Sequence, residues 1–234
     1  MMSEPQDAKK RPLNLAEYYL LTCLDQHGKY LTQPHTIRVG LAGAVLTDLA
    51  RRGYLYVTRD VVIIKSGVST NLEEPLASLL QIMKDAPENQ DAEQWINRFS
   101  RPGLKNSILQ ALVVRGDITV MTKRLFGLVP RTRYVPEESY GRMDMYVRLR
   151  ATLLGRETAL DASTWPLVQL LYSTDVLTRL FPGLQNKTVK DRLDAFHAEA
   201  AQKEPAIAEA LQAVENAIAE SLTATRGQAT GMRG

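Results

Sequence analysis

Apolar residues recur at steps of three and four along most of this chain, the spacing of one face of an α-helix. The pattern predicts helices within residues 13–25, 37–52, 72–86, 91–100, 104–114, 140–154, 165–181 and 205–222. Asn14, with Glu17 three residues on, and Asp91 are N-capping residue types at two of the starts. Gly53 and Gly116 stand where two of the helices should end. We therefore expect a mainly α protein.

Two stretches of the chain repeat one order of patterns. They read "LTDLARRGYLYVTRDVVIIKSG" from Leu46 and "LQALVVRGDITVMTKRLFGLVP" from Leu109, each a helix, an Arg-Gly pair and two β-branched runs. The first predicts a β-hairpin that turns near Arg59–Asp60, and the second a hairpin over 117–129. The segment 130–139, "PRTRYVPEES", is bracketed by prolines and is expected to be a loop. These units favour one domain of packed helices with small β-hairpins.

No change in composition divides the chain into two units. Residues 1–12 are polar and charged and predict a disordered lead, 13–224 a single globular domain, and 225–234 a flexible tail. The last long helix should begin at Pro205, with Ile207, Leu211, Val214, Ile218 and Leu222 on one stripe. Gly40 and Gly43, in the helix over 37–52, allow another element to approach that helix closely.

Composition limits the cellular setting. Apolar runs fall short of the roughly 20 residues that span a membrane, and the N-terminal sequence has no apolar secretory region. The single cysteine, Cys23, cannot form an internal disulfide and lies on an apolar helix face. We expect a cytoplasmic protein.

Motifs for catalysis are absent. His27, His35 and His197 are scattered, no GxSxG or GxGxxG occurs, and one cysteine without a histidine pair gives no zinc ligand set. The prediction is a protein that is not an enzyme, with no metal and no cofactor.

Charge is concentrated in one part of the chain. Residues 123–156 hold eight basic and three acidic residues, whereas the whole chain has a net charge of only +3. An anionic partner is expected to bind there. The candidate ligand-binding residues for an anionic headgroup are Arg131, Arg133, Arg142, Arg148 and Arg150. The competing interpretation is that Arg131 and Arg133 pair with carboxylates and hold the loop.

The two helix–hairpin units also suggest winged helices that bind nucleic acid. A recognition helix needs several exposed residues that reach base edges. Both candidate helices are apolar through most of their length, so nucleic acid is the less favoured partner.

A succession of motifs resembles the Golgi phosphoprotein 3 family, whose yeast member is a vacuolar sorting protein. In order they are "LNLAEYYLLTCLD", "GLAGAVLTDLARRGYLYV", "AEQWINRF", "VVRGDITVMTKRLFGLVPRTRY", "LRATLLG" and "LLYSTDVLTRLF", which span about Leu13 to Leu222. The "PRTRY" segment is most similar to the bacterial relatives. The resemblance implies a single mostly helical domain that is non-enzymatic and peripheral to membranes.

The resemblance also implies a ligand and partners. Eukaryotic members bind phosphatidylinositol 4-phosphate and link Golgi membranes to the cytoplasmic tails of glycosyltransferases and to coat proteins. Of the family's four headgroup positions, the tryptophan falls near Gln33, the first basic residue at Ala42, and the others near Asp144 and near Val147 or Arg148. At most one basic residue is therefore kept. A hairpin used in family self-association matches "GRETALDAST" from Gly155, which is several residues shorter.

These observations lead to one interpretation and one alternative. The first is a cytoplasmic, non-enzymatic adaptor that binds an anionic, phosphoinositide-like lipid on the cytosolic face of a membrane, which is the Golgi if the source is eukaryotic. Its further expected partners are protein tails and a second copy of the chain. The alternative is a winged-helix-like nucleic-acid-binding protein.

Overall fold

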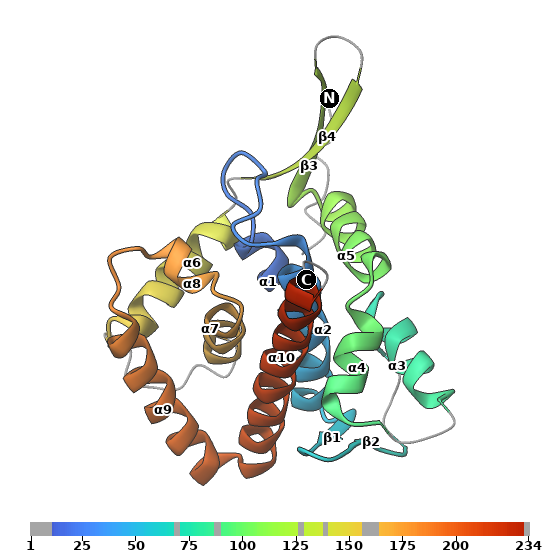
Figure 1. The fold of residues 1–234 in the computed structure, drawn as a ribbon, viewed down its shortest axis with the longest axis vertical. Helices are drawn as coiled ribbons and strands as arrows, with labels where there is room; N and C mark the ends of the chain where they lie inside the picture. Colours follow the sequence, from blue (N-terminus) through green and yellow to red (C-terminus); the bar gives the residue numbers. More distant parts are fainter. Residues whose placement is uncertain are drawn as a thin grey trace, which may run out of the picture.

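The computed structural model describes the backbone of residues 11–67, 71–86, 90–125, 129–137, 140–155 and 164–231. Within these ranges it describes all side chains except those of 123–131, 140, 141 and 226–231. The expected mainly α fold with two small hairpins is confirmed (Figure 1).

The helices follow one another with two hairpins between them. The first half contains α1 (Leu15–Thr22), α2 (Pro34–Arg51), β1 (Leu55–Val57), β2 (Val62–Ile64), α3 (Leu76–Lys84), α4 (Ala92–Phe99) and α5 (Pro102–Arg115). The second half contains β3 (Ile118–Leu125), β4 (Val129–Pro136), α6 (Tyr140–Leu153), α7 (Thr164–Ser173), α8 (Leu177–Leu180), α9 (Asn186–Lys203) and α10 (Pro205–Gly231).

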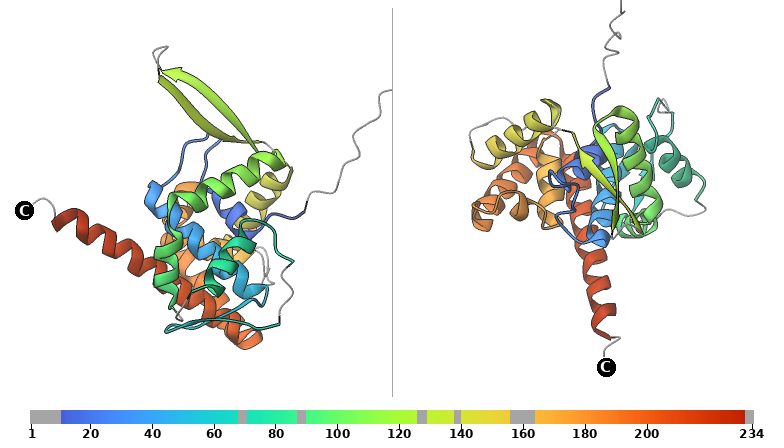
Figure 2. Two further views of the ribbon diagram at one scale, coloured as in Figure 1. Left: turned by 90° about the vertical axis from the view of Figure 1, so that its right-hand side faces the viewer. Right: turned by 90° about the horizontal axis from the view of Figure 1, so that it is seen from above.

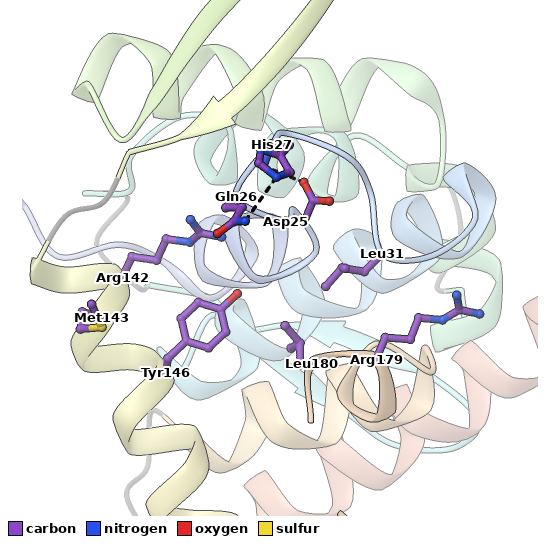
Figure 3. Close-up of a pocket in the computed structure, with 9 residues that line it drawn as sticks. All are labelled: Asp25, Gln26, His27, Leu31, Arg142, Met143, Tyr146, Arg179 and Leu180. Atoms are coloured by element: carbon purple, nitrogen blue, oxygen red, sulfur yellow. Dashed lines mark hydrogen bonds between the residues drawn. The ribbon is translucent and has the colours of Figure 1, made fainter. Parts of the chain in front are cut away.

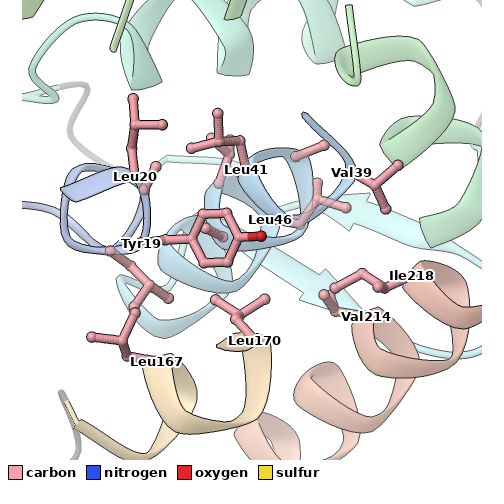
Figure 4. Close-up of a cluster of buried hydrophobic side chains, with 14 of the residues drawn as sticks. Tyr19, Leu20, Val39, Leu41, Leu46, Leu167, Leu170, Val214 and Ile218 are labelled. Atoms are coloured by element: carbon pink, nitrogen blue, oxygen red, sulfur yellow. The ribbon is translucent and has the colours of Figure 1, made fainter. Parts of the chain in front are cut away.

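Helix α2 is the centre of the core. Every residue from Val39 to Ala50 is buried, and α1, α4, α5, α7 and α10 all contact this helix (Figures 1 and 4). The small residues predicted to allow close approach do so. A Cβ atom added at Gly40 would overlap the Tyr19 ring of α1, and one at Gly43 would lie 2.7 Å from Ile218 Cδ1 of α10. Glycine at these two positions therefore sets how closely α1 and α10 pack on α2.

The start of α1 is held by a buried ionic network. Asn14 and Glu17 form the predicted capping box, and Arg11 donates hydrogen bonds of 2.8 and 2.5 Å to the fully buried Glu17 carboxylate. Arg52, at the end of α2, pairs with Asp48 at 3.1 Å and with Glu73 at 3.0 Å. Paired and hydrogen-bonded carboxylates can be buried at tolerable cost. The network joins the beginning of α1 to the end of α2.

Both hairpins are antiparallel, and the second is longer than predicted. The segment that contains Arg131 and Arg133 is not a loop: it is strand β4, with Met121 opposite Arg133 and Lys123 opposite Arg131. Its two prolines misled the prediction. A two-stranded hairpin leaves both edges free, so Pro130 and Pro136 fit near the ends of β4 without the loss of a ladder bond inside a sheet. Figure 2 shows this hairpin extending away from the helical body.

The C-terminal half departs from the prediction in three places. The expected single helix over 165–181 divides into α7 and α8, because Asp175 between them has φ +54°. Helix α9 was not predicted, although Val189, Leu193, Phe196 and Ala200 lie at helical spacing and are buried. Helix α10 begins at Pro205 as expected but continues to Gly231, into the segment expected to be a tail.

Replacing Gly40 by alanine should lower the free energy of unfolding. Overpacking against the buried Tyr19 costs about 1–3 kcal/mol, which exceeds the gain of up to about 1 kcal/mol in helix propensity. Urea unfolding measures the difference. Gly103→Ala in α5 is the matched control, since nothing lies within 4 Å of its added Cβ and its stability should be unchanged or higher. Equal stability of the Gly40 variant and this control would contradict the packing.

Acid should weaken the network at Glu73. Burial alone raises the pKa of this carboxyl, but the hydrogen bond from Arg52 and the charges of Arg52 and Arg11 outweigh burial and leave the pKa below its ordinary value of 4.5. The carboxylate therefore stabilises the fold above that value, and this stability is lost as pH falls from 4.5 through the lower pKa of the folded state. As pH falls across this range, the free energy of unfolding should decrease more steeply for the wild type than for Glu73→Gln. Parallel curves would show that the network contributes nothing at this position.

Candidate functional site

The predicted arginines are distributed over two elements. Arg131 lies in β4, but its side chain is outside the described residues. Arg133, two residues on, is exposed on the same strand. Arg148 pairs with Asp144 at 2.8 Å on α6, and Arg150 is exposed one turn before the end of that helix.

Arg142 has a different environment. It lies in the first turn of α6, donates a hydrogen bond of 2.9 Å from Nη2 to the Leu24 carbonyl, and lies 5.5 Å from the centre of the Tyr146 ring. It lines a cavity of about 440 Å³ (Figure 3). Its backbone bond ties α6 to the chain directly after α1.

The loop between α1 and α2 brings Arg133 and Arg142 to one region. Asp25 Oδ1 accepts hydrogen bonds of 2.8 Å from the backbone N–H groups of His27 and Lys29, and Leu24 forms a β-bridge with Tyr30. Gly28, at φ +71°, lies directly against the Tyr134 backbone of β4, where no side chain would fit. The loop is thus held by its own hydrogen bonds, with β4 on one side and α6 on the other.

A second cavity lies between this loop and β4. Its volume is about 770 Å³, and its lining includes Lys29, Tyr30, Gln33, Pro34 and Arg133. The two cavities share Asp25 and His27, so Arg133 lines one and Arg142 the other. Arg148 and Arg150 line neither.

Two basic residues that were not predicted as ligand-binding lie near the lining residues of the larger cavity, although neither lines it. Arg38 of α2 donates a hydrogen bond of 3.0 Å from Nε to the carbonyl of Ser100, two residues before the start of α5. Lys105 of α5 lies with its Nζ 5.1 Å from the centre of the Tyr30 ring, and Tyr30 lines the cavity. The N-terminal parts of α2 and α5 therefore lie close together, and each contributes a half-buried cation, Arg38 as the fifth residue of α2 and Lys105 as the fourth of α5.

The electrostatics of this cluster are unfavourable without a counter-charge. Burial and the neighbouring Arg38 guanidinium lower the pKa of Lys105, and the same two causes, in the same order, lower the pKa of His35. Both helices begin with proline after a residue that makes no side-chain cap, Gln33 for α2 and Arg101 for α5. Helix N-termini carry partial positive charge and unpaired N–H groups, so cations are disfavoured there and anions are favoured.

The sequence held a signal for this cluster. Proline at the first helical position without a preceding Ser, Thr, Asp or Asn, followed by a basic residue in the next turn, breaks the usual charge preference of a helix start. The pattern occurs at Pro34–Arg38 and again at Pro102–Lys105. Local charge density along the chain could not reveal it, since the two residues lie far apart in sequence.

The positions matched to the family's headgroup pocket have clear environments. Ala42 is fully buried in the core of α2, so no ligand reaches it. Gln33 is exposed at the start of α2 and lines the larger cavity. Asp144 pairs with Arg148 on α6. Arg38, about one turn before Ala42, is half-buried and bonds to the Ser100 carbonyl.

The structure argues against α2 as a recognition helix for nucleic acid. Helix α2 is enclosed by five other helices, so it cannot enter a groove of DNA.

The described residues offer little for catalysis or metal binding. Within the described part of the chain, no three His, Cys, Asp or Glu residues are grouped to hold a metal ion. Burial raises the pKa of the Cys23 thiol to about 12, so it is not activated as a nucleophile.

Comparison with known proteins identifies the family. No helix of the described residues is both long and apolar enough to cross a membrane. A search of curated proteins found no match. The sequence profile described as Golgi phosphoprotein 3 (GPP34) matches residues 15–218, which run from the start of α1 into α10. The chain therefore belongs to the Golgi phosphoprotein 3 (GPP34) family.

Proposed function

We propose that this protein is a non-enzymatic, peripheral membrane adaptor that binds the phosphorylated headgroup of an anionic lipid where the first turns of α2 and α5 meet. The observation that carries the proposal is the half-buried pair Arg38 and Lys105 at two helix starts without side-chain caps. Family membership supports a phosphoinositide as the lipid. Its location is then the cytosolic face of a membrane, and the tails of membrane proteins are its partners.

The physical case rests on what an anion would relieve. Each of the two cations loses hydration on burial and repels the other, and each lies near the positive end of a helix. A phosphate monoester brings about two negative charges and several acceptor oxygens. It can accept from both side chains and from the free N–H groups of the first turns. Such charge-assisted bonds contribute about 1.5–3 kcal/mol each.

The adjoining cavity gives the headgroup room. It extends from Tyr30 and Gln33 to Arg133, and its volume of about 770 Å³ is within the range of about 300–1,000 Å³ found for small-molecule sites. Arg133 adds a further cation at the far side of the cavity. In this proposal Arg133 keeps its predicted role, whereas Arg148 and Arg150 contribute at most to the field of the surface.

Vesicle flotation tests the site. Wild-type protein should float with phosphatidylcholine vesicles that contain phosphatidylinositol 4-phosphate and remain unbound with phosphatidylcholine alone. Lys105→Glu should lower binding at least about tenfold, because it removes one charge-assisted bond and adds repulsion. Excess inorganic phosphate should displace the protein from the vesicles only weakly if the inositol ring and the bilayer contribute to binding. It should displace the protein fully if the site recognises the phosphate group alone.

The control variant is Lys187→Glu, which makes the same charge change at an exposed position of α9. Its binding should match the wild type at the same ionic strength. If Lys105→Glu and Arg38→Gln both bind like the wild type, the headgroup site is not here.

A stability measurement separates a binding role from a structural one. Because burial and Arg38 lower the pKa of Lys105, its charged form is less stable in the folded protein than in the unfolded chain. Lys105→Gln should therefore leave the melting temperature unchanged or raise it while vesicle binding falls. A lower melting temperature together with unchanged binding would mean that Lys105 serves the fold.

A further inference from the structure

The imidazole of His35 joins the beginning of α2 to the C-terminal part of α10. His35 is the second residue of α2, and its Nε2 lies within hydrogen-bond distance, 2.8 Å, of Thr225 Oγ1. The ring also forms a hydrogen bond with the backbone of Ser221, about one turn earlier on α10. The side chain therefore ties the first turn of α2, where we place the headgroup, to a helix that extends beyond the helical body (Figure 2).

The partners of this ring on α10 suit a protonated imidazole. The Thr225 hydroxyl donates its single hydrogen to the Ser221 carbonyl at 3.1 Å, which leaves its oxygen able to accept from Nε2. The hydrogen bond to the Ser221 backbone raises the pKa of the ring, as a carbonyl that accepts from a ring N–H does. Because an imidazolium donates from both nitrogens, α10 offers acceptors to the charged form.

The charges around the ring oppose its protonation. Burial has the largest effect and the neighbouring Arg38 guanidinium the next, and together they outweigh the Ser221 bond, so the pKa of His35 lies below its ordinary value of 6.5. The positive end of α2 acts in the same direction, and the ring is therefore neutral in most molecules at about pH 7. Further charged residues on the adjoining elements are Arg98 of α4, which lies over the Trp95 ring, Lys105 of α5, Glu220 of α10, which lines a separate cavity beside the start of α4, and Arg226 of α10, whose side chain is outside the described residues.

A bound anion would reverse this balance, because negative charge at the first turn of α2 favours a nearby imidazolium and offsets Arg38. We propose that His35 makes headgroup binding proton-linked: the ring takes up a proton when the headgroup binds, donates to Thr225, and so strengthens binding as pH falls. This inference rests on the proposed headgroup site and concerns its regulation. The gain in affinity is present in full below the pKa of the free protein, and it disappears as pH rises through the higher pKa of the bound state.

The ring signals of histidine in nuclear magnetic resonance spectra of the wild type test the linkage. Over about pH 5 to 8, the His35 ring should show a higher pKa with saturating inositol 1,4-bisphosphate than without it. His197 of α9, which lies 3.6 Å from a Glu215 carboxylate oxygen, is the control in the same spectra and should respond to pH alike in both. An unchanged pKa of His35 in protein that has bound the ligand would overturn the inference.

The pH dependence of affinity tests the consequence. The ligand phosphate takes up a proton of its own near about pH 6, which weakens binding in acid for every variant. The comparison is therefore the ratio of the wild-type affinity to that of His35→Gln at each pH. Because the coupling is reciprocal, this ratio should rise at least about fivefold from the alkaline to the acid end of the range. A constant ratio would contradict the linkage.

Two variants of α10 test the bridge itself. Thr225→Val keeps the shape of the side chain but removes the oxygen that faces the His35 ring, so the rise in pKa on ligand binding should shrink. Thr223→Val is the matched control, since Thr223 likewise donates to the carbonyl four residues earlier, at 2.8 Å, and should respond as the wild type does. A full wild-type response in Thr225→Val would overturn the part assigned to α10.

The outcomes separate this inference from the function on which it rests. Binding that is lost in Lys105→Glu, but has the same pH profile in the wild type and in His35→Gln, would support the headgroup site and refute the proton linkage. No binding of inositol 1,4-bisphosphate by the wild type at any pH would refute both.

Discussion

The close packing of α1 and α10 on α2 is the constraint on which the rest of the structure depends. It exists because Gly40 and Gly43 present no side chain to Tyr19 and Ile218. Because five helices pack on α2, its side chains become accessible mainly near its two ends. One end carries the ionic network of Arg52, Asp48 and Glu73, and the other carries the α1–α2 loop and Arg38. The stability of the core thus fixes the position of the surface where we place function.

That surface carries cations where the ends of two helices favour anions. Helix starts favour capping and acidic side chains, whereas α2 and α5 have no side-chain cap and carry Arg38 and Lys105 within their first five residues. Departures from the usual residue preferences of a helix start often occur at functional sites. The rest of the fold then supplies the stability that such a departure removes. Here Arg38 is held by the Ser100 carbonyl and Lys105 by the Tyr30 ring, so both cations are in position before an anion arrives.

The sequence predicted what is encoded locally. The caps at Asn14 and Asp91, the ends near Gly53 and Gly116 and the first hairpin all follow from a few adjacent residues. The prediction of a loop at β4 was wrong because prolines usually indicate a loop. They fit this strand because it pairs with β3 alone, which leaves its other edge free. The Arg38–Lys105 pair was missed because the fold joins residues distant in the chain, whereas the charge-rich segment 123–156 distributes its arginines over β4 and α6.

The central claim is that an anionic headgroup binds where α2 and α5 begin, and amide chemical shifts measure this most directly. Titrating isotope-labelled protein with inositol 1,4-bisphosphate, a water-soluble headgroup, should shift the backbone amides of His35, Thr36, Gly103 and Leu104 most strongly. These N–H groups lie in the first turns of the two helices. Shifts confined to Arg148 and Arg150 on α6, with the first turns of α2 and α5 unmoved, would contradict the account.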